Sequence, residues 1–180
     1  SFYSESGRAW LIRDGKRMKV TADMRLLSGD KIEVEEKGDL RVTWNDSTVT
    51  QFLDESKASF EIQDGAKLIH FKNGKLLATV TKQPKGKPLK VISPNSVSTV
   101  LGTRFLLKVN QLESMLEVRR GSVQLTRKSD GKSVVVNAHE YAVASPRQKL
   151  QVTKSSSAVF RSQEINLDTK DRKIDIVAEI

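Results

Sequence analysis

The amino-acid sequence predicts an all-β domain of many short, mostly antiparallel strands, arranged as a sandwich or a solenoid. Three observations predict it. Apolar residues alternate with polar ones in one short run after another, which is the period of a half-buried strand. Turn-forming residues recur roughly every nine or ten residues between residues 38 and 80, the spacing typical of all-β folds. Apolar spacing typical of helices is almost absent.

The first clear strand is expected at 39–44 (DLRVTW), where every second residue from Leu40 to Trp44 is apolar. Runs of the same character follow in order at 48–53, 58–62, 67–71, 75–80, 89–93, 97–101, 104–109, 114–120, 122–127, 133–138 and 140–144. We therefore expect each of these ranges to form a strand.

Tight turns are expected between these runs. The candidates are Asn45-Asp46, Asp64-Gly65, Asn73-Gly74 and Ser129-Asp130-Gly131. Asn, Asp and Gly accept the positive φ angles that hairpin turns require. Each of these sites is thus predicted to be a turn between two strands.

The chain of 180 residues is long enough for one domain or for one domain with an appendage. We expect residues 1–150 to form the β domain. After Pro146 the composition changes, and three serines stand at 155–157. Residues 151–180 are predicted to be a serine-containing linker with one or two additional strands, or the start of a further domain.

The chain carries 31 basic and 22 acidic residues, a net charge of +9. Such an excess suits an anionic polymer, a membrane surface or an acidic partner, but the lysines form no dense cluster, which favours a solvated surface. Nucleic-acid binding is not expected. Cysteine is absent, which excludes disulfides and thiolate sites. No apolar run approaches the ~18 residues of a membrane-spanning helix.

The sequence offers little catalytic chemistry. The two histidines, His70 and His139, each stand alone in a strand-like run, whereas a zinc site needs three or four ligands at set spacing. G-x-S-x-G, Walker A and H-E-x-x-H motifs are absent, and the carboxylates are dispersed. We expect a protein that is not an enzyme, with no catalytic residues, no cofactor and no metal site.

The stretch 102–105 (GTRF) interrupts the alternating strand pattern. Our structural interpretation is that Gly102 takes a conformation barred to residues with a Cβ, that Thr103 hydrogen-bonds the bent backbone, and that Phe105 re-enters the core. Arg104 would then point the other way. The alternative is a small site presented to a ligand.

Six segments in order, at 26–34, 38–49, 74–80, 89–109, 116–126 and 135–143, give the chain a resemblance to the FecR family over residues 7 to 145. The matching positions are Gly29, Asp30, Pro94, Gly102, Thr103, Phe105, Val118, Gly121, Val123 and Glu140. Before its late Glu the family usually has Gly, but this chain has His139.

The resemblance implies a FecR-type all-β domain in the bacterial periplasm or cell envelope, attached to the membrane through a segment absent from this chain. It implies a non-catalytic protein-interaction domain that relays signals from the cell surface to a sigma factor. The implied partner is another envelope protein, an outer-membrane transporter or a membrane-anchored regulator. The alternative is an envelope scaffold domain that binds cell-wall or other anionic polymers. The motif residues Gly29, Asp30, Gly102, Thr103, Phe105, Gly121 and Glu140 are interpreted as structural.

Overall fold

A computed structural model describes residues 2–4, 7–22 and 24–155. These residues form strands, turns and loops, and the described part of the chain contains no helix. Consequently no helix among the described residues has the length and apolar character to span a membrane. The expected all-β fold class is confirmed.

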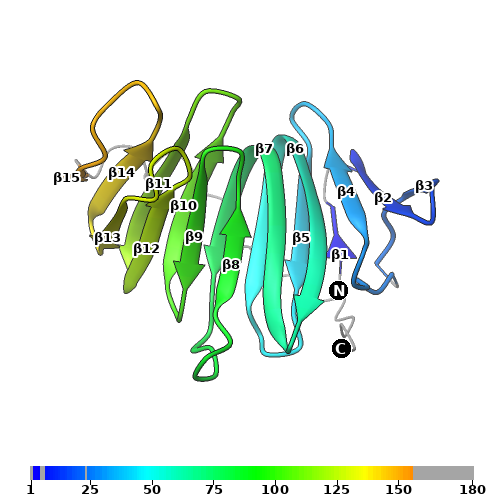
Figure 1. The fold of residues 1–180 in the computed structure, drawn as a ribbon. Coiled ribbons are helices and arrows are strands. Elements are labelled where there is room, and N and C mark those ends of the chain that lie inside the picture. The colour runs from blue at the N-terminus through cyan, green and yellow to red at the C-terminus, as the bar shows by residue number, and fades with distance from the viewer. Residues whose placement is uncertain (1, 5–6, 23, 156–180) are drawn as a thin grey trace.

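The strands belong to one open sheet that folds back on itself into two facing layers (Figure 1). The pairing is antiparallel throughout, except where β8 runs parallel to β7. In order across the first layer lie β3 (Lys16–Lys19), β2 (Ala9–Arg13), β4 (Lys31–Val34), the second half of β6 (Val49–Gln63), the first half of β7 (Ala66–Thr79), β8 (Leu89–Ile92), β9 (Ser96–Val100), β12 (Ser122–Arg127) and β13 (Ser133–Asn137).

The second layer is built around the other halves of β6 and β7. Its order is β1 (Phe2–Tyr3), β5 (Asp39–Thr43), β6, β7, β10 (Arg104–Val109), β11 (Ser114–Arg120), β14 (Glu140–Ala144) and β15 (Val152–Lys154). The layers are therefore joined through β6 and β7, which pass from one to the other.

The long strands β6 and β7 correct one sequence prediction. Asn73-Gly74 was expected to be a hairpin turn, but it lies inside β7, where the β6–β7 register shifts near Lys57. A Cβ at Gly74 would lie 2.6 Å from the Cα of Ser56 on β6, so the glycine permits close approach of the two backbones at the bend. The predicted turn at Asp64-Gly65 does connect β6 to β7.

The core lies between the two layers and consists mainly of Val, Leu and Ile with a small aromatic cluster. Phe52 contacts Phe60 and Phe71 edge-on, with ring centres 5.7 and 5.8 Å apart, and Trp44 packs edge-on against Phe60 at 5.9 Å. Such edge-to-face pairs add to the stabilisation from buried area. Trp44 is 3% exposed.

The sheet continues to the end of the described chain. Val152–Lys154 forms β15 and pairs with β14. Most of the region expected to be a linker with additional strands, residues 156–180, lies outside the described residues. The proposed division of the chain at residue 150 therefore stays a prediction.

Candidate interaction surface

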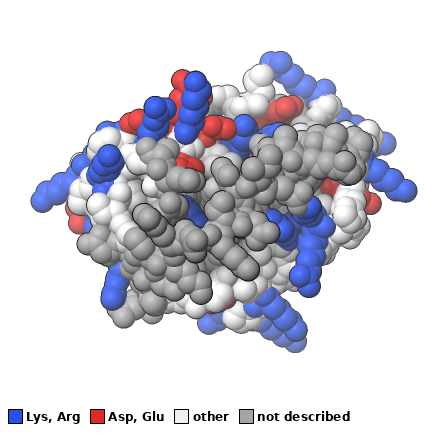
Figure 2. All heavy atoms as spheres, turned by 180° about the vertical axis from the view of Figure 1, so that it is seen from behind, with Lys and Arg blue, Asp and Glu red and all other residues white. Residues whose placement is uncertain are grey.

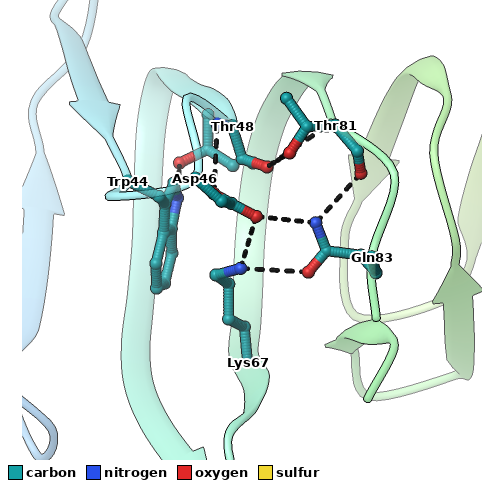
Figure 3. Close-up of polar contacts among 7 residues, drawn as sticks. Trp44, Asp46, Thr48, Lys67, Thr81 and Gln83 are labelled. Carbon is teal, nitrogen blue, oxygen red and sulfur yellow. Dashed lines mark hydrogen bonds and ion pairs between the residues drawn. The ribbon is translucent and has the colours of Figure 1, made fainter. Parts of the chain in front are cut away.

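A partly buried ion pair joins a turn of the second layer to a strand of the first layer (Figure 3). Lys67 occupies a core-facing position of β7, and its Nζ lies 2.6 Å from an Asp46 carboxylate oxygen and 3.0 Å from Gln83 Oε1. The Gln83 amide donates to Asp46 at 2.8 Å and to the Thr81 carbonyl at 2.9 Å. The Lys67 ammonium also lies 5.9 Å from the Trp44 ring centre.

The charge of Asp46 is stabilised by this network. Burial opposes its ionisation, but hydrogen bonds from Lys67, Gln83 and the Thr48 backbone N–H outweigh burial and lower the pKa of the Asp46 carboxyl to about 2. The polar atoms of Lys67, Asp46 and Gln83 thus have partners within the network, which is typical of a structural contact rather than an open binding site. We call these three residues the brace.

The chain segment that carries Gln83 also bonds to the backbone at and beside the 102–105 motif. The segment after β7 donates from Val80 N–H to the Thr103 carbonyl and from Gln83 N–H to the Leu101 carbonyl, both at 2.8 Å. Beside these bonds, a Cβ at Gly102, where φ is +155°, would lie 3.2 Å from the Cα of Lys82. Glycine suits this position for two reasons: residues with a Cβ disfavour this backbone conformation, and the Lys82 backbone lies close to Gly102.

The expected role of the Thr103 hydroxyl is wrong. Thr103 is 4% exposed, and its Oγ1 has no hydrogen-bond partner in the described residues. Its methyl group lies toward Gly121, where an added Cβ would come within 2.7 Å of Thr103 Cγ2 and 2.8 Å of the Gly102 carbonyl. The Thr103 methyl therefore fills the space beside the Gly121 backbone.

Arg104 and Phe105 lie on opposite faces of β10, as expected for neighbouring residues of a strand. Phe105 is fully buried in the core, whereas Arg104 is partly exposed on the outward side of β10. The register of β10 with β11 shifts between these two residues. The stretch 102–105 therefore contains a bend followed by a core anchor.

Asp30 anchors the other family-motif region. It is 1% exposed, and its carboxylate accepts two hydrogen bonds from Arg13, both 2.7 Å, and one from the Leu27 N–H at 2.7 Å. The hydrogen bond to Asp30 raises the pKa of the Arg13 guanidinium. Gly29, with φ of +93°, donates its N–H to the Phe60 carbonyl at 2.8 Å. Gly29 and Asp30 thus fix the turn before β4 on β6.

The turn between β13 and β14 is retained although it lacks the family's glycine. His139 has φ of +66° and occupies the left-handed conformation itself. The Glu140 carboxylate accepts from both the backbone N–H and the side-chain amide of Asn137, at 2.8 and 3.1 Å. Glu140 therefore closes this turn and holds the last residue of β13.

Strand β13 is an open edge of the first layer. Among the described residues it pairs with β12 alone. The Arg127 N–H donates to the Lys132 carbonyl at 2.8 Å, so Arg127 and Lys132, just before β13, form a hydrogen-bonded pair. Along an antiparallel ladder, hydrogen-bonded pairs alternate with pairs whose backbone groups point away from each other. Consequently the N–H and C=O groups of Ser133 and Val135 point away from β12 and are available to pair with another strand.

The other edge strands of the described sheet have features that disfavour pairing with another strand, whereas β13 has none of these features. Edge strand β3 carries Lys16, Arg17 and Lys19, and edge strands β1 and β15 have only two and three residues. Charge and shortness are two ways in which proteins prevent edge pairing. By contrast, β13 (SVVVN) has five residues and no charge, and its Val135 is 55% exposed.

The two histidines lie in a strand pair and in a turn. His70 lies 3.2 Å from Glu61 on the neighbouring strand, and His139 is in the turn described above. Within the described ranges, no group of three or more His, Asp or Glu side chains is placed to hold a metal ion.

The model of the family described as "FecR protein" matches residues 30–124, more than half of the chain. The chain belongs to the FecR family. The match contains Asp30, Gly102, Thr103, Phe105 and Gly121. Strand β13, Glu140 and Gly29 lie outside it, so the open edge belongs to a part of this FecR-family chain that the family model does not reach.

Two solved structures share the fold of this FecR-family chain. Both are crystal structures, at 1.65 and 2.50 Å, of a "putative anti-sigma factor" from Parabacteroides distasonis ATCC 8503. They are 18% and 19% identical to it, with TM-scores of 0.64 and 0.62 over 74% and 70% of this chain. The chain spans 63% and 60% of their lengths. Comparison with curated proteins finds no match.

Sequence reasoning identified the FecR family but missed the brace and the open edge. Lys67 begins the run KLIHF, where a lysine ordinarily faces solvent, and its partners are 21 and 16 residues away in the sequence. The run SVVVN was recognised as a strand, and its lack of charge is the signal that could have marked it as an edge.

Proposed function

We propose that this chain is a regulatory domain of the bacterial cell envelope that binds another envelope protein and performs no catalysis. Membership of the FecR family supports the regulatory role. Likeness in fold to two crystal structures titled "putative anti-sigma factor" agrees with it. In this proposal the domain lies outside the cytoplasm and passes a signal through protein contact toward a sigma factor.

The observation that carries the proposal is the uncharged edge strand β13. Its outward-pointing backbone groups at Val135 and its exposed Val135 side chain suit the addition of an extended strand from a partner. Main-chain hydrogen bonds supply affinity in this mode, and side-chain positions on alternate residues supply specificity. The proposed occupant is an extended, alternating segment of an envelope protein.

The charge around β13 defines the partner further. Lys128 and Lys132 lie in the turn that precedes the strand, and the Lys132 side chain is 73% exposed. Asp130 offsets part of this charge, with its carboxylate 3.6 Å from Lys132 Nζ. We therefore expect a carboxylate in the partner segment near this end of the strand.

A polyanion-binding domain is the second candidate, favoured by the net charge of +9. In the view from behind, the visible Lys and Arg side chains lie at several separate places on the molecule (Figure 2). A dispersed charge supports weak, salt-sensitive attraction more than a built polymer site.

Capture from envelope extract by the immobilised full chain tests the proposal. Val135→Lys places a charge on the edge, and Leu112→Lys is the matched control because Leu112 is also 55% exposed but lies in the β10–β11 turn. We expect Val135→Lys to reduce the captured protein at least about tenfold and Leu112→Lys to leave it unchanged.

Two results would overturn the proposal. One is capture by Val135→Lys equal to that of the unchanged chain. The other is capture of wall polymer alone that disappears as salt is raised, which would favour the polyanion candidate.

A further inference from the structure

The outward face of the second layer carries a row of apolar side chains. Along each strand these positions alternate with core residues, and the strand register places them side by side. Leu77 on β7 lies opposite Leu106 on β10, and Met115 on β11 lies opposite Val143 on β14. Tyr141 on β14 lies opposite Glu117 on β11, the neighbour of Leu106.

Leu106 is fully buried although it points away from the core. Its strand neighbours Phe105 and Leu107 belong to the cluster between the layers, and Leu106 does not. Glu117, also on this face, is 2% exposed. Among the described elements, the main neighbours of β10 are β7 and β11, which lie in the same layer. A leucine on an uncovered sheet face would be exposed to solvent, so this face requires a cover from outside the described strands.

The path of the chain leads to this face. Ser155, the last described residue, follows β15 at the edge of the second layer, and its hydroxyl donates to the Glu117 carboxylate. The 180 − 155 = 25 residues that follow could extend about 80 Å, whereas the width from β14 across to β7 is about 15 Å. The segment 156–180 is therefore long enough to cross the face and return.

The composition of segment 156–180 fits the face. Two alternating apolar pairs occur in it, Ile165 with Leu167 and Ile174 with Ile176. It contains four basic and five acidic residues, 4 − 5 = −1, in a chain whose net charge is +9. The face itself presents Arg104 and Lys108 on β10, together with Glu117 on β11 and with Lys75 on β7, whose Nζ lies 2.8 Å from an Asp54 carboxylate oxygen. Apolar alternation and carboxylates are what such a face would accept.

We propose that the outward face of the second layer is a docking surface for segment 156–180 of the same chain. In this arrangement the apolar row from Leu77 to Tyr141 is covered by Ile and Leu side chains of the segment, and Ser155 fixes the point at which the segment enters. An uncovered apolar row of this kind would otherwise be an association site.

Thiol labelling tests this inference in the full chain, because the chain has no cysteine of its own. Met115→Cys introduces one thiol on the covered face, and Thr99→Cys introduces one on the outward side of β9, in the other layer. Each is combined with a segment in which the apolar pairs are replaced by serine: Ile165→Ser, Leu167→Ser, Ile174→Ser and Ile176→Ser. A matched segment carries Gln163→Ser, Asn166→Ser and Thr169→Ser instead.

We expect the apolar replacements to speed reaction of Met115→Cys with a maleimide at least about tenfold, since the rate follows the uncovered fraction. Reaction of Thr99→Cys should stay the same, and so should both rates with the matched segment. A Met115→Cys rate that the apolar replacements leave unchanged would overturn the inference. Equal acceleration at Thr99→Cys would overturn it too, because it would indicate general unfolding. No partner is present in this assay, so its outcome is independent of capture through β13.

Discussion

Lys67 and Asp46 form a 2.6 Å ion pair between a strand of the first layer and a turn of the second. The Lys67 side chain is 9% exposed, whereas that of Asp46 is 31% exposed. The pair therefore has a buried cation and a partly hydrated anion. Removal of the Asp46 carboxylate therefore leaves the buried Lys67 ammonium without its main partner, which should destabilise the fold.

Asp46→Asn should lower the free energy of unfolding by about 2–4 kcal/mol, because a buried ammonium loses its counter-charge. The double variant Asp46→Asn with Lys67→Met should recover much of this loss, since no uncompensated charge remains. Urea denaturation of the two single variants and the double variant measures the coupling. Additive losses would mean that the pair has no specific energetic role.

Acid should weaken the same contact. The folded-state pKa of Asp46 is about 2, below its ordinary value of 3.8, so the stabilisation is present above about pH 4 and is lost as the pH falls toward 2. Urea midpoints of the unchanged chain should fall over this range more steeply than those of Asp46→Asn. Asp130, whose pKa the Arg127 guanidinium also lowers, contributes to both proteins equally. Parallel curves would contradict the assignment.

Gly121→Ala should destabilise the domain by about 1–3 kcal/mol. The residue has φ of +80°, and the new Cβ would meet the Thr103 methyl and the Gly102 carbonyl. Gly131→Ala is the control, because φ there is +68° but no atom lies within 4 Å of the added Cβ. Thermal melts should show the larger loss at Gly121. Equal losses would mean that backbone strain alone, without crowding, decides both positions.

Phe105→Ala should cost about 3–5 kcal/mol, because the ring is fully buried between the layers. Arg104→Ala should change the free energy of unfolding by less than about 1 kcal/mol, since its partly exposed side chain lies on the face opposite the core and contributes at most a screened charge contact there. Both are measured by thermal or urea unfolding. A large loss from Arg104→Ala with unchanged Phe105→Ala stability would reverse the inward and outward assignment of this strand.

Local rules predicted the strands and most turns because period-two patterns and Asp-Gly pairs act within a few residues. They failed at Asn73-Gly74, where β6 and β7 continue through a bend and the glycine serves close packing on Ser56 instead of a turn. Whether a glycine closes a hairpin or admits a neighbouring strand depends on what lies opposite, and a local pattern does not contain that information.

The partners of buried polar groups were equally beyond local rules. Lys67 is separated by many residues from Asp46 and Gln83, and only the facing of two layers brings them together. Thr103 was predicted to bond the backbone, but its hydroxyl has no partner among the described residues and its methyl lies beside Gly121. The edge position of β13 follows from strand order, which the run SVVVN alone does not reveal.

Amide hydrogen exchange, followed by NMR in the presence and absence of the captured envelope protein, tests the central claim most directly. If a partner strand adds to β13, exchange should slow at least about tenfold at Ser133 and Val135, whose N–H groups point away from β12. Val134 and Val136 already bond to β12 and should change much less. Protection elsewhere on the domain, with Ser133 and Val135 unchanged, would contradict the account.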